Sequence, residues 1–183
     1  MTESVFDAIT AASVAATGAS RGWLLRLTDA ELRVVAAAGD RAGDALGVSV
    51  PADLGTAGFA VASGQPLAAL VRADDDRFTV GVARAVGIGA TSVLCVPCTT
   101  DDGVVGALEV IDKVGGGPFS IDDVELVTLL GTIAGAGLVG FDGEAVAVAT
   151  PEELASELRQ LSTADPSRYA SIAALVSSLL AYG

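Results

Sequence analysis

The sequence predicts an α+β domain in which helices cover one mainly antiparallel sheet of five to six strands. Two observations lead to this prediction. Apolar runs of strand length come in pairs joined by short polar turns, which is typical of antiparallel hairpins. Segments with apolar residues at helical spacing lie between these pairs. With 183 residues, 51% of them hydrophobic and 18% charged, the chain is long and apolar enough to bury a full core.

The first part of the chain predicts a helix followed by a hairpin. Apolar residues at helical spacing indicate a helix over Glu3–Ala16, and Gly18 then ends it. Arg21–Thr28 and Glu31–Gly39 follow as two strands joined by a short turn. The Gly-rich stretch Asp40–Val50 is expected to be irregular.

The middle of the chain combines two short helices with three strands. Leu54–Gln65 predicts a helix, which is followed by a strand at Pro66–Val71. A small helix is expected over Phe78–Val86. Thr91–Thr99 and Gly103–Asp112 then form a second hairpin, because the residues between them favour a tight turn.

A long apolar helix completes the predicted domain. Ser120 and Asp123 have the spacing of a capping box, in which two side chains satisfy free N–H groups at a helix start. The helix that follows is expected over Ile121–Gly140. The composition changes beyond Gly143, so we expect one domain over residues 1–143 and a helical tail over 144–183.

The tail predicts two helices. Pro151–Tyr182 contains two helix-start signals, with a break expected at Ser162–Ala164. An apolar stripe runs along both helices, and it either packs on the domain or docks on a protein partner.

The charge of the chain excludes several kinds of partner. The sequence contains ten Lys and Arg residues and 23 Asp and Glu residues, which gives a formal net charge of −13. Such a chain repels phosphate backbones and anionic lipids, so neither nucleic acid nor a membrane surface is expected as a partner. The start carries acidic residues where an export signal would be basic, and both long uncharged runs are shorter than a membrane span. We therefore expect a cytoplasmic protein.

Histidine is absent from the sequence, which removes most acid–base and nucleophilic triads as well as His-ligated haem. No metal site is expected, because zinc would need two thiolates plus carboxylates. The two cysteines, Cys95 and Cys98, lie on one predicted strand, so they point to opposite faces with Cα atoms roughly 10 Å apart. A disulfide needs about 7 Å or less. We interpret both as structural; a reactive thiol, if there is one, would be Cys98.

Four local patterns resemble those of the GAF domain family, a group of PAS-like small-molecule sensors. The resemblance extends from about Ser4 to Val139, and the patterns occur in the family's order and spacing. They are GTAGFAVASGQPL (Gly55–Leu67), VARAVGIGATSVLCVP (Val82–Pro97), GVVGALEVIDK (Gly103–Lys113) and PFSIDDVELVTLLGTIAG (Pro118–Gly135).

The resemblance implies a pocket for a small ligand between the sheet and its covering helices. Cyclic-nucleotide-binding relatives tend to carry polar side chains at the positions of Ala83 and Ala90, which here cannot bond a base. This chain lacks the residues to which the family's bilin and haem ligands attach, so no cofactor is expected. The apolar lining of the implied pocket favours a small apolar ligand. The implied lining residues are Thr56, Ala57, Phe78, Val82, Ala83, Ile88, Ala90 and Glu109.

A motif of cyclic-nucleotide-binding members, Asn-Lys followed by a spaced Phe and Asp-Glu, is retained in part. Lys113, Phe119 and Asp123 match it, while Asp112 replaces the Asn and Val124 replaces the Glu. We interpret the match as structural, with Lys113 and Asp123 forming an ion pair that joins strand to helix.

The resemblance implies a non-catalytic regulatory or sensory module in signal transduction, whose output passes through a partner or the tail. It also implies a homodimer through the first and last helices of the domain. Gly131, Gly135 and Gly137 would either let another helix approach or pack on the sheet. One alternative is a ligand-free scaffold for protein–protein interaction. Another is a thiol-dependent reductase of free methionine sulfoxide, whose cysteine positions this chain does not match.

Overall fold

The structure, a computed structural model, describes residues 4–71, 80–140, 159–160, 162–164 and 166. The chain forms two compact units, Glu3–Val146 and Ala147–Gly183. The sheet and the helices that cover it belong to the first unit.

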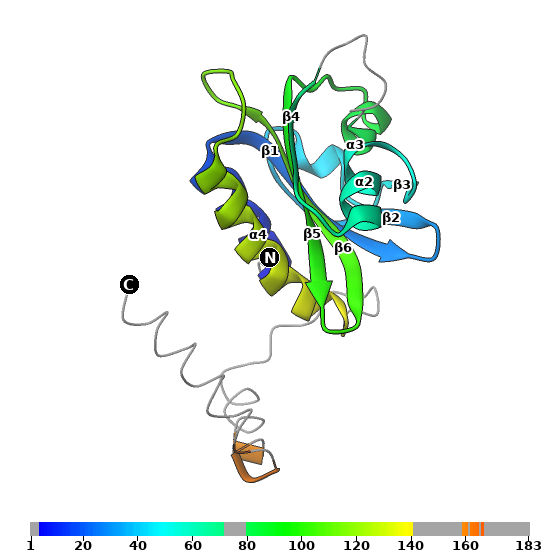
Figure 1. The fold of residues 1–183 in the computed structure, drawn as a ribbon, viewed down its shortest axis with the longest axis vertical. Helices are drawn as coiled ribbons and strands as arrows, with labels where there is room; N and C mark the ends of the chain where they lie inside the picture. Colours follow the sequence, from blue (N-terminus) through cyan, green and yellow to red (C-terminus); the bar gives the residue numbers. More distant parts are fainter. Residues whose placement is uncertain (1–3, 72–79, 141–158, 161, 165, 167–183) are drawn as a thin grey trace. The chain divides into compact units, whose positions relative to one another are not determined.

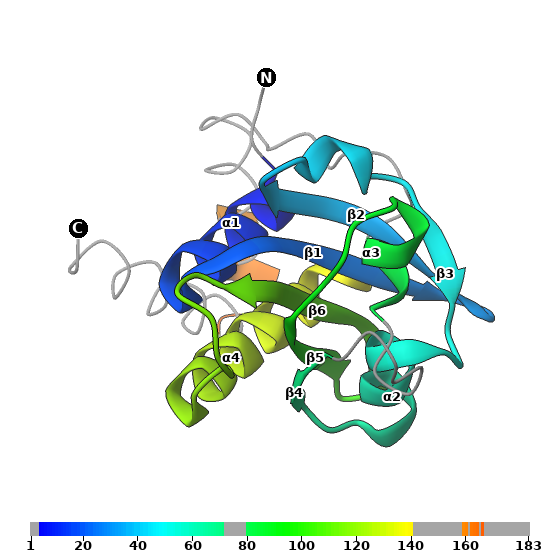
Figure 2. The ribbon, with the colours of Figure 1, turned by 90° about the horizontal axis from the view of Figure 1, so that it is seen from above.

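The first unit is built on one six-stranded antiparallel sheet (Figures 1 and 2). The strands lie in the order β3-β2-β1-β6-β5-β4. This confirms the predicted α+β architecture and its predicted hairpins. The strands are β1 (Ala19–Thr28), β2 (Glu31–Gly39), β3 (Ser49–Pro51), β4 (Leu67–Leu70), β5 (Ser92–Thr100) and β6 (Gly103–Lys113).

The region expected to be irregular contains a short strand that the sequence pattern did not indicate. β3 has three residues and pairs with β2, with Val50 opposite Leu32. A 3-10 turn, η1 (Ala42–Asp44), precedes it. A strand this short has no periodicity of its own, so only its pairing with β2 defines it.

The helices begin and end at the predicted signals. Ser120 and Asp123 form a complete capping box at the start of the last helix. Gly18 and Gly64 end the first two helices in the left-handed conformation, which glycine adopts without strain. The helices are α1 (Val5–Thr17), α2 (Gly55–Ser63), α3 (Gly81–Ala85) and α4 (Ile121–Leu138).

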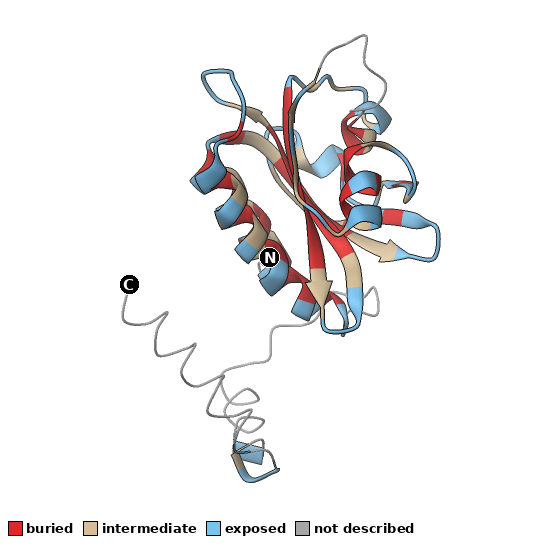
Figure 3. Cartoon of the chain, viewed as in Figure 1, coloured by how far each residue is buried: buried red, intermediate tan, exposed pale blue. Residues whose placement is uncertain are grey.

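Helices cover both faces of the sheet (Figure 3). Alternate residues of a strand point to opposite sides of the sheet. On β1, for example, Leu24 points to one side while Trp23 points to the other. We call the side under α1 and α4 the helix face; its buried residues include Phe6, Leu24, Leu94, Val96, Cys98, Leu108, Val127 and Leu138. We call the side under α2 and α3 the pocket face; its buried residues include Trp23, Leu25, Val34, Ala57, Val82, Ala83, Cys95 and Ile111.

The glycines of α4 bring the helix close to its neighbours within the domain. A Cβ atom at Gly135 would lie 2.5 Å from the backbone oxygen of Thr99, and one at Gly131 would lie 2.8 Å from Val96. A Cβ at Gly137 would lie 2.8 Å from the ring of Phe6 on α1. Of the two roles considered for these glycines, internal packing is therefore the one that the structure shows.

The tail prediction is wrong at one point. Residues 162–164, where a break was expected, are helical. The hydroxyls of Ser162 and Thr163 both donate to the carbonyl oxygen of Arg159, at 2.8 and 3.3 Å. Such back-bonding keeps Ser and Thr compatible with a helix. The apolar stripe of the tail lies outside the described residues. Among the described residues, no helix is long and apolar enough to cross a membrane.

Candidate functional site

A buried carboxyl group, Glu109 of β6, lies in the middle of the pocket face. Its register partners are Trp23 on β1 and Cys95 on β5, so the three side chains form a row across three neighbouring strands. Glu109 and Trp23 are each 1% exposed, and Cys95 is fully buried. A buried ionisable group costs free energy unless it is hydrogen-bonded, so its partners decide what it can do.

Hydrogen bonds satisfy both oxygens of this carboxyl. Trp23 Nε1 donates to Glu109 Oε2 at 2.6 Å, and Thr56 Oγ1 donates to Glu109 Oε1 at 2.5 Å. Cys95 lies beside the carboxyl as its register partner on β5. Thr56 lies in the first turn of α2 and is fully buried. The carboxyl therefore fastens α2 to the middle of the sheet.

Burial and hydrogen bonding act in opposite directions on this group. Burial raises the pKa of Glu109 above its ordinary 4.5, and the hydrogen bonds from Thr56 and Trp23 only partly offset this rise. Burial also raises the pKa of the Cys95 thiol, and the neighbouring Glu109 raises it further. Perturbed groups of this kind cluster at functional sites, which makes the row a candidate site.

The structure brings the expected pocket-lining residues together on this face, apart from Phe78, which lies outside the described residues. Ile88 and Ala90 are partly buried and pack against the pocket-face cluster. The fully or nearly fully buried members are Thr56, Ala57, Val82, Ala83 and Glu109.

Protein atoms enclose the polar centre of this face. Thr56, Val82 and Ala83 are at most 1% exposed, as is Glu109. An open ligand-sized cavity would leave the side chains that line it accessible to water. No open ligand-sized cavity therefore exposes these four side chains.

Two partners of Glu109 were not among the expected site residues. Trp23 is the single tryptophan of the chain, and its place in the apolar run of β1 was the signal that could have indicated a buried position. Cys95 was expected only as a small core residue; the structure places it directly beside Glu109 on the neighbouring strand. Pairing across strands depends on register, which neither residue reveals alone.

The two cysteines face opposite sides of the sheet, as predicted. Both are free, with Cys95 on the pocket face and Cys98 on the helix face. Burial raises the pKa of Cys98 to about 12. Because the thiolate is the reactive form, this pKa disfavours the reactive role considered for Cys98.

The predicted ion pair between Lys113 and Asp123 is present, with Lys113 Nζ bonded to Asp123 Oδ2. The same Nζ lies 5.4 Å from the ring centroid of Phe119, so the three retained motif residues form one cluster. Burial would raise the pKa of Asp123, but the hydrogen bonds from Lys113 and Ser120 outweigh it and lower the pKa. The cluster joins the end of β6 to the start of α4.

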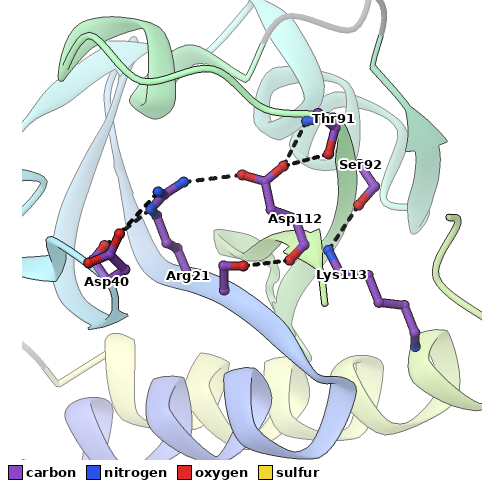
Figure 4. Close-up of polar contacts among 7 residues, drawn as sticks. Arg21, Asp40, Thr91, Ser92, Asp112 and Lys113 are labelled. Carbon is purple, nitrogen blue, oxygen red and sulfur yellow. Dashed lines mark hydrogen bonds and ion pairs between the residues drawn. The ribbon is translucent and has the colours of Figure 1, made fainter. Parts of the chain in front are cut away.

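Asp112, which replaces the Asn of the family motif, is the centre of a second polar cluster (Figure 4). Its Oδ1 accepts hydrogen bonds from Thr91 N at 2.7 Å and Thr91 Oγ1 at 2.9 Å. Its Oδ2 forms an ion pair with Arg21 Nη1 at 3.1 Å, and Arg21 also pairs with Asp40. Asp112 has a φ of 56°, in the left-handed region that Asn and Asp adopt more readily than most residues. Aspartate thus suits this backbone conformation and also forms an ion pair with Arg21.

Within the described part of the chain, no group of three or more His, Cys, Asp or Glu residues is placed to hold a metal ion.

Solved structures similar to this chain share its fold. The second GAF domain of DevS from Mycobacterium smegmatis is 22% identical, with a TM-score of 0.59, and the match covers 86% of this chain and 96% of that one. The GAF domain of the Acinetobacter phosphoenolpyruvate-protein phosphotransferase is 17% identical, with a TM-score of 0.62 and coverages of 74% and 80%. A type II free methionine-R-sulfoxide reductase from Thermoplasma acidophilum is 14% identical, with a TM-score of 0.57 and coverages of 73% and 88%.

Comparison with curated proteins gives no match. Comparison with family descriptions matches the GAF domain over residues 2–138. Because this match spans well over half of the 183 residues, the chain belongs to the GAF domain family.

Proposed function

We propose that this GAF domain is a non-catalytic sensory or regulatory module that acts as a homodimer through α1 and α4. The pocket face, on the other side of the sheet, receives a small and mainly apolar ligand. The observation that carries the proposal is the row of exposed apolar side chains on the outer surface of the two helices.

Apolar side chains line this surface. Leu129 is 59% exposed, Ile133 is 50% exposed, and Val5 of α1 is 57% exposed. Asp7 is the single charged residue of α1, and α4 carries no charged residue after Glu125. We call the surface the dimer face; it comprises Val5, Ala8, Ala12 and Ala15 of α1 and Leu126, Leu129, Ile133 and Ala136 of α4.

A second copy of the chain is the partner that fits this face best. Two copies that each carry a formal net charge of −13 repel each other, and the repulsion is weakest across a surface with few charged side chains. On α4 the exposed charges, Asp122 and Glu125, lie near the start of the helix. Both helices space their outer apolar residues by three and four positions, which is typical of helices that pair along a seam. The alanines of α1 allow the backbones to approach closely.

Two leucines with the same exposure provide a matched test of dimerisation. Leu129 on the dimer face is 59% exposed, and Leu46, in a loop on the pocket-face side, is 58% exposed. Size-exclusion chromatography with light scattering should give a dimer for the unmodified protein and for Leu46→Glu, but a monomer for Leu129→Glu. A monomeric unmodified protein, or dissociation by both substitutions, would contradict the proposed dimer.

The enclosed pocket face gives specific support to a second candidate, a ligand-free scaffold. Mass spectra of the protein under native and denaturing conditions separate the two candidates. A small adduct that is lost on denaturation supports the sensory role. A bare protein mass that a panel of nucleotides and apolar metabolites leaves unchanged supports the scaffold.

The surroundings of the thiols support the non-catalytic part of the proposal. Cys95 and Cys98 are buried, face opposite sides, and have raised pKa values, so neither is a ready thiolate nucleophile. Incubation with free methionine-(R)-sulfoxide and dithiothreitol should yield no methionine above the protein-free control. Protein-dependent turnover would instead support the reductase alternative.

A further inference from the structure

Residues 86–91, which we call the strap, connect α3 to β5 and cross the pocket face (Figure 2). Val86, Ile88 and Ala90 are partly buried and pack against the pocket-face cluster. The residues between them are glycines. The strap therefore covers the same cluster that contains Trp23 and Cys95, which are partners of the Glu109 carboxyl.

The two ends of the strap are held differently. At the α3 end, Gly87 takes the left-handed conformation with a φ of 70°, and Ile88 N donates to Ala83 O at 2.9 Å. At the β5 end, Thr91 donates through both its backbone N and its hydroxyl to Asp112 Oδ1. Thr91 O also accepts a bond from Val71 N at 2.9 Å. The carboxylate provides the charge-assisted contacts, which are the stronger kind.

Asp112 is itself fixed from several sides (Figure 4). Arg21 pairs with its Oδ2, and the hydroxyl of Ser20 donates to its backbone oxygen at 2.8 Å. The side chains of Arg21 and Asp112 are only 17% and 20% exposed, so water screens this pair less than a surface pair. The carboxylate therefore offers Thr91 a preorganised acceptor.

We propose that Asp112 is the latch of the strap, and that releasing Thr91 from this carboxylate opens the pocket face to a ligand. The inference rests on the proposed sensory role, because a closed pocket face must open before a ligand enters. α2, which also covers this face, is fastened by the fully buried bond from Thr56 to Glu109. The strap is instead fastened at its exposed end and carries glycines on both sides of Ile88.

The chain carries its own reporters of such an opening. Trp23 is the single tryptophan, 1% exposed on the pocket face, so its fluorescence reports access from that side. Cys95 lies on the same face, while Cys98 lies on the helix face. Opening of the strap exposes Cys95 alone, whereas global unfolding exposes both thiols.

Asp112→Gly tests the latch most directly, because glycine keeps the positive φ and removes both acceptor oxygens. Thr91→Val is a milder variant that removes only the hydroxyl bond. Asp112→Asn keeps an acceptor and the backbone conformation but loses the ion pair. Asp44→Asn is the matched control, because Asp44 forms an exposed ion pair with Arg41 away from the strap.

We expect loss of the two charge-assisted bonds in Asp112→Gly to raise the rate of Cys95 labelling by N-ethylmaleimide at least about tenfold. The labelling rate of Cys98, measured by mass spectrometry on the same sample, should not change. Acrylamide should quench the fluorescence of Trp23 most strongly in Asp112→Gly, less strongly in Thr91→Val and least strongly in Asp112→Asn. Quenching in Asp44→Asn should equal that of the unmodified protein.

A folded Asp112→Gly that protects Cys95 and Trp23 as well as the unmodified protein overturns the latch. Equal acceleration at both cysteines also overturns it, because it reports global destabilisation. If Asp112→Gly does not fold, Thr91→Val decides by the same criteria. The labelling pattern is measured on the protein alone, so a missing ligand adduct or a monomeric mass contradicts the proposed function without affecting this test.

Discussion

The helix face and the pocket face are built from alternate residues of the same strands, yet they bury different chemistry. The helix face combines apolar side chains with glycines that let α4 approach β5 closely. The pocket face contains a buried carboxyl that accepts hydrogen bonds from two buried donors, Trp23 and Thr56. The helix face therefore depends on close packing, so added side-chain volume should lower its stability. The pocket face depends on a polar network, so loss of a hydrogen-bond partner should lower its stability.

Close packing on the helix face predicts the largest effect. A methyl group added in Gly135→Ala would lie 2.5 Å from the Thr99 backbone oxygen and 3.0 Å from its nitrogen, so α4 must shift. We expect the free energy of unfolding to fall by about 3 kcal/mol, measured by urea denaturation followed by circular dichroism. Gly140→Ala is the control, because nothing lies within 4 Å of its added methyl group. Equal stability of the two variants would mean that α4 is not closely packed.

The polar network of the pocket face predicts an intermediate effect. In Glu109→Gln the amide can accept from Thr56 or from Trp23 but not from both, so one buried donor loses its acceptor. We expect a loss of about 2 kcal/mol in the free energy of unfolding. Glu125→Gln, an exposed substitution on α4, should leave stability unchanged.

The same variant has a pH signature. The pKa of Glu109 is raised on folding, so the stability it contributes is fully present below its ordinary 4.5 and is lost as pH rises through the folded pKa. Glutamine does not titrate. The stability difference between the unmodified protein and Glu109→Gln should therefore be larger at pH 4 than at pH 8, and the opposite trend would contradict a raised pKa.

The Lys113–Asp123 pair at the end of the helix face predicts the smallest effect. Lys113→Met keeps an apolar side chain near Phe119 and removes the ion pair, with an expected loss of about 1 kcal/mol. Asp44→Asn, which removes a more exposed pair, should cost less. A larger loss from Asp44→Asn would show that burial does not strengthen the Lys113 pair.

This pair also depends on pH, in the opposite direction to Glu109. The pKa of Asp123 is lowered on folding, so its contribution to stability is present above its ordinary 3.8 and is lost as pH falls through the folded pKa. The cost of Lys113→Met should accordingly shrink in denaturation curves recorded near pH 3. A cost that does not change with pH would show that the pair does not lower this pKa.

Local sequence signals predicted most of the helices and strands, one ion pair and the orientations of the two cysteines. Gly18 and Gly64 end helices because glycine adopts positive φ freely, and Ser120 with Asp123 starts α4. The ion pair of Lys113 with Asp123 followed from their positions at the end of one element and the start of the next. The opposite orientations of Cys95 and Cys98 followed from strand alternation.

The partners of Glu109 depend instead on the tertiary structure. Trp23 is far from it in the chain, and only the registers of β1 and β6 bring the two side chains into one row. The same holds for Asp112 of β6. Its carboxylate contacts Arg21 of β1 and Thr91, which directly precedes β5. The sequence by itself determined most of the helices and strands, though not β3, because caps and periodicity act over a few residues. Only the tertiary structure decided which side chains meet, because strand register and helix docking depend on the packing of the whole core.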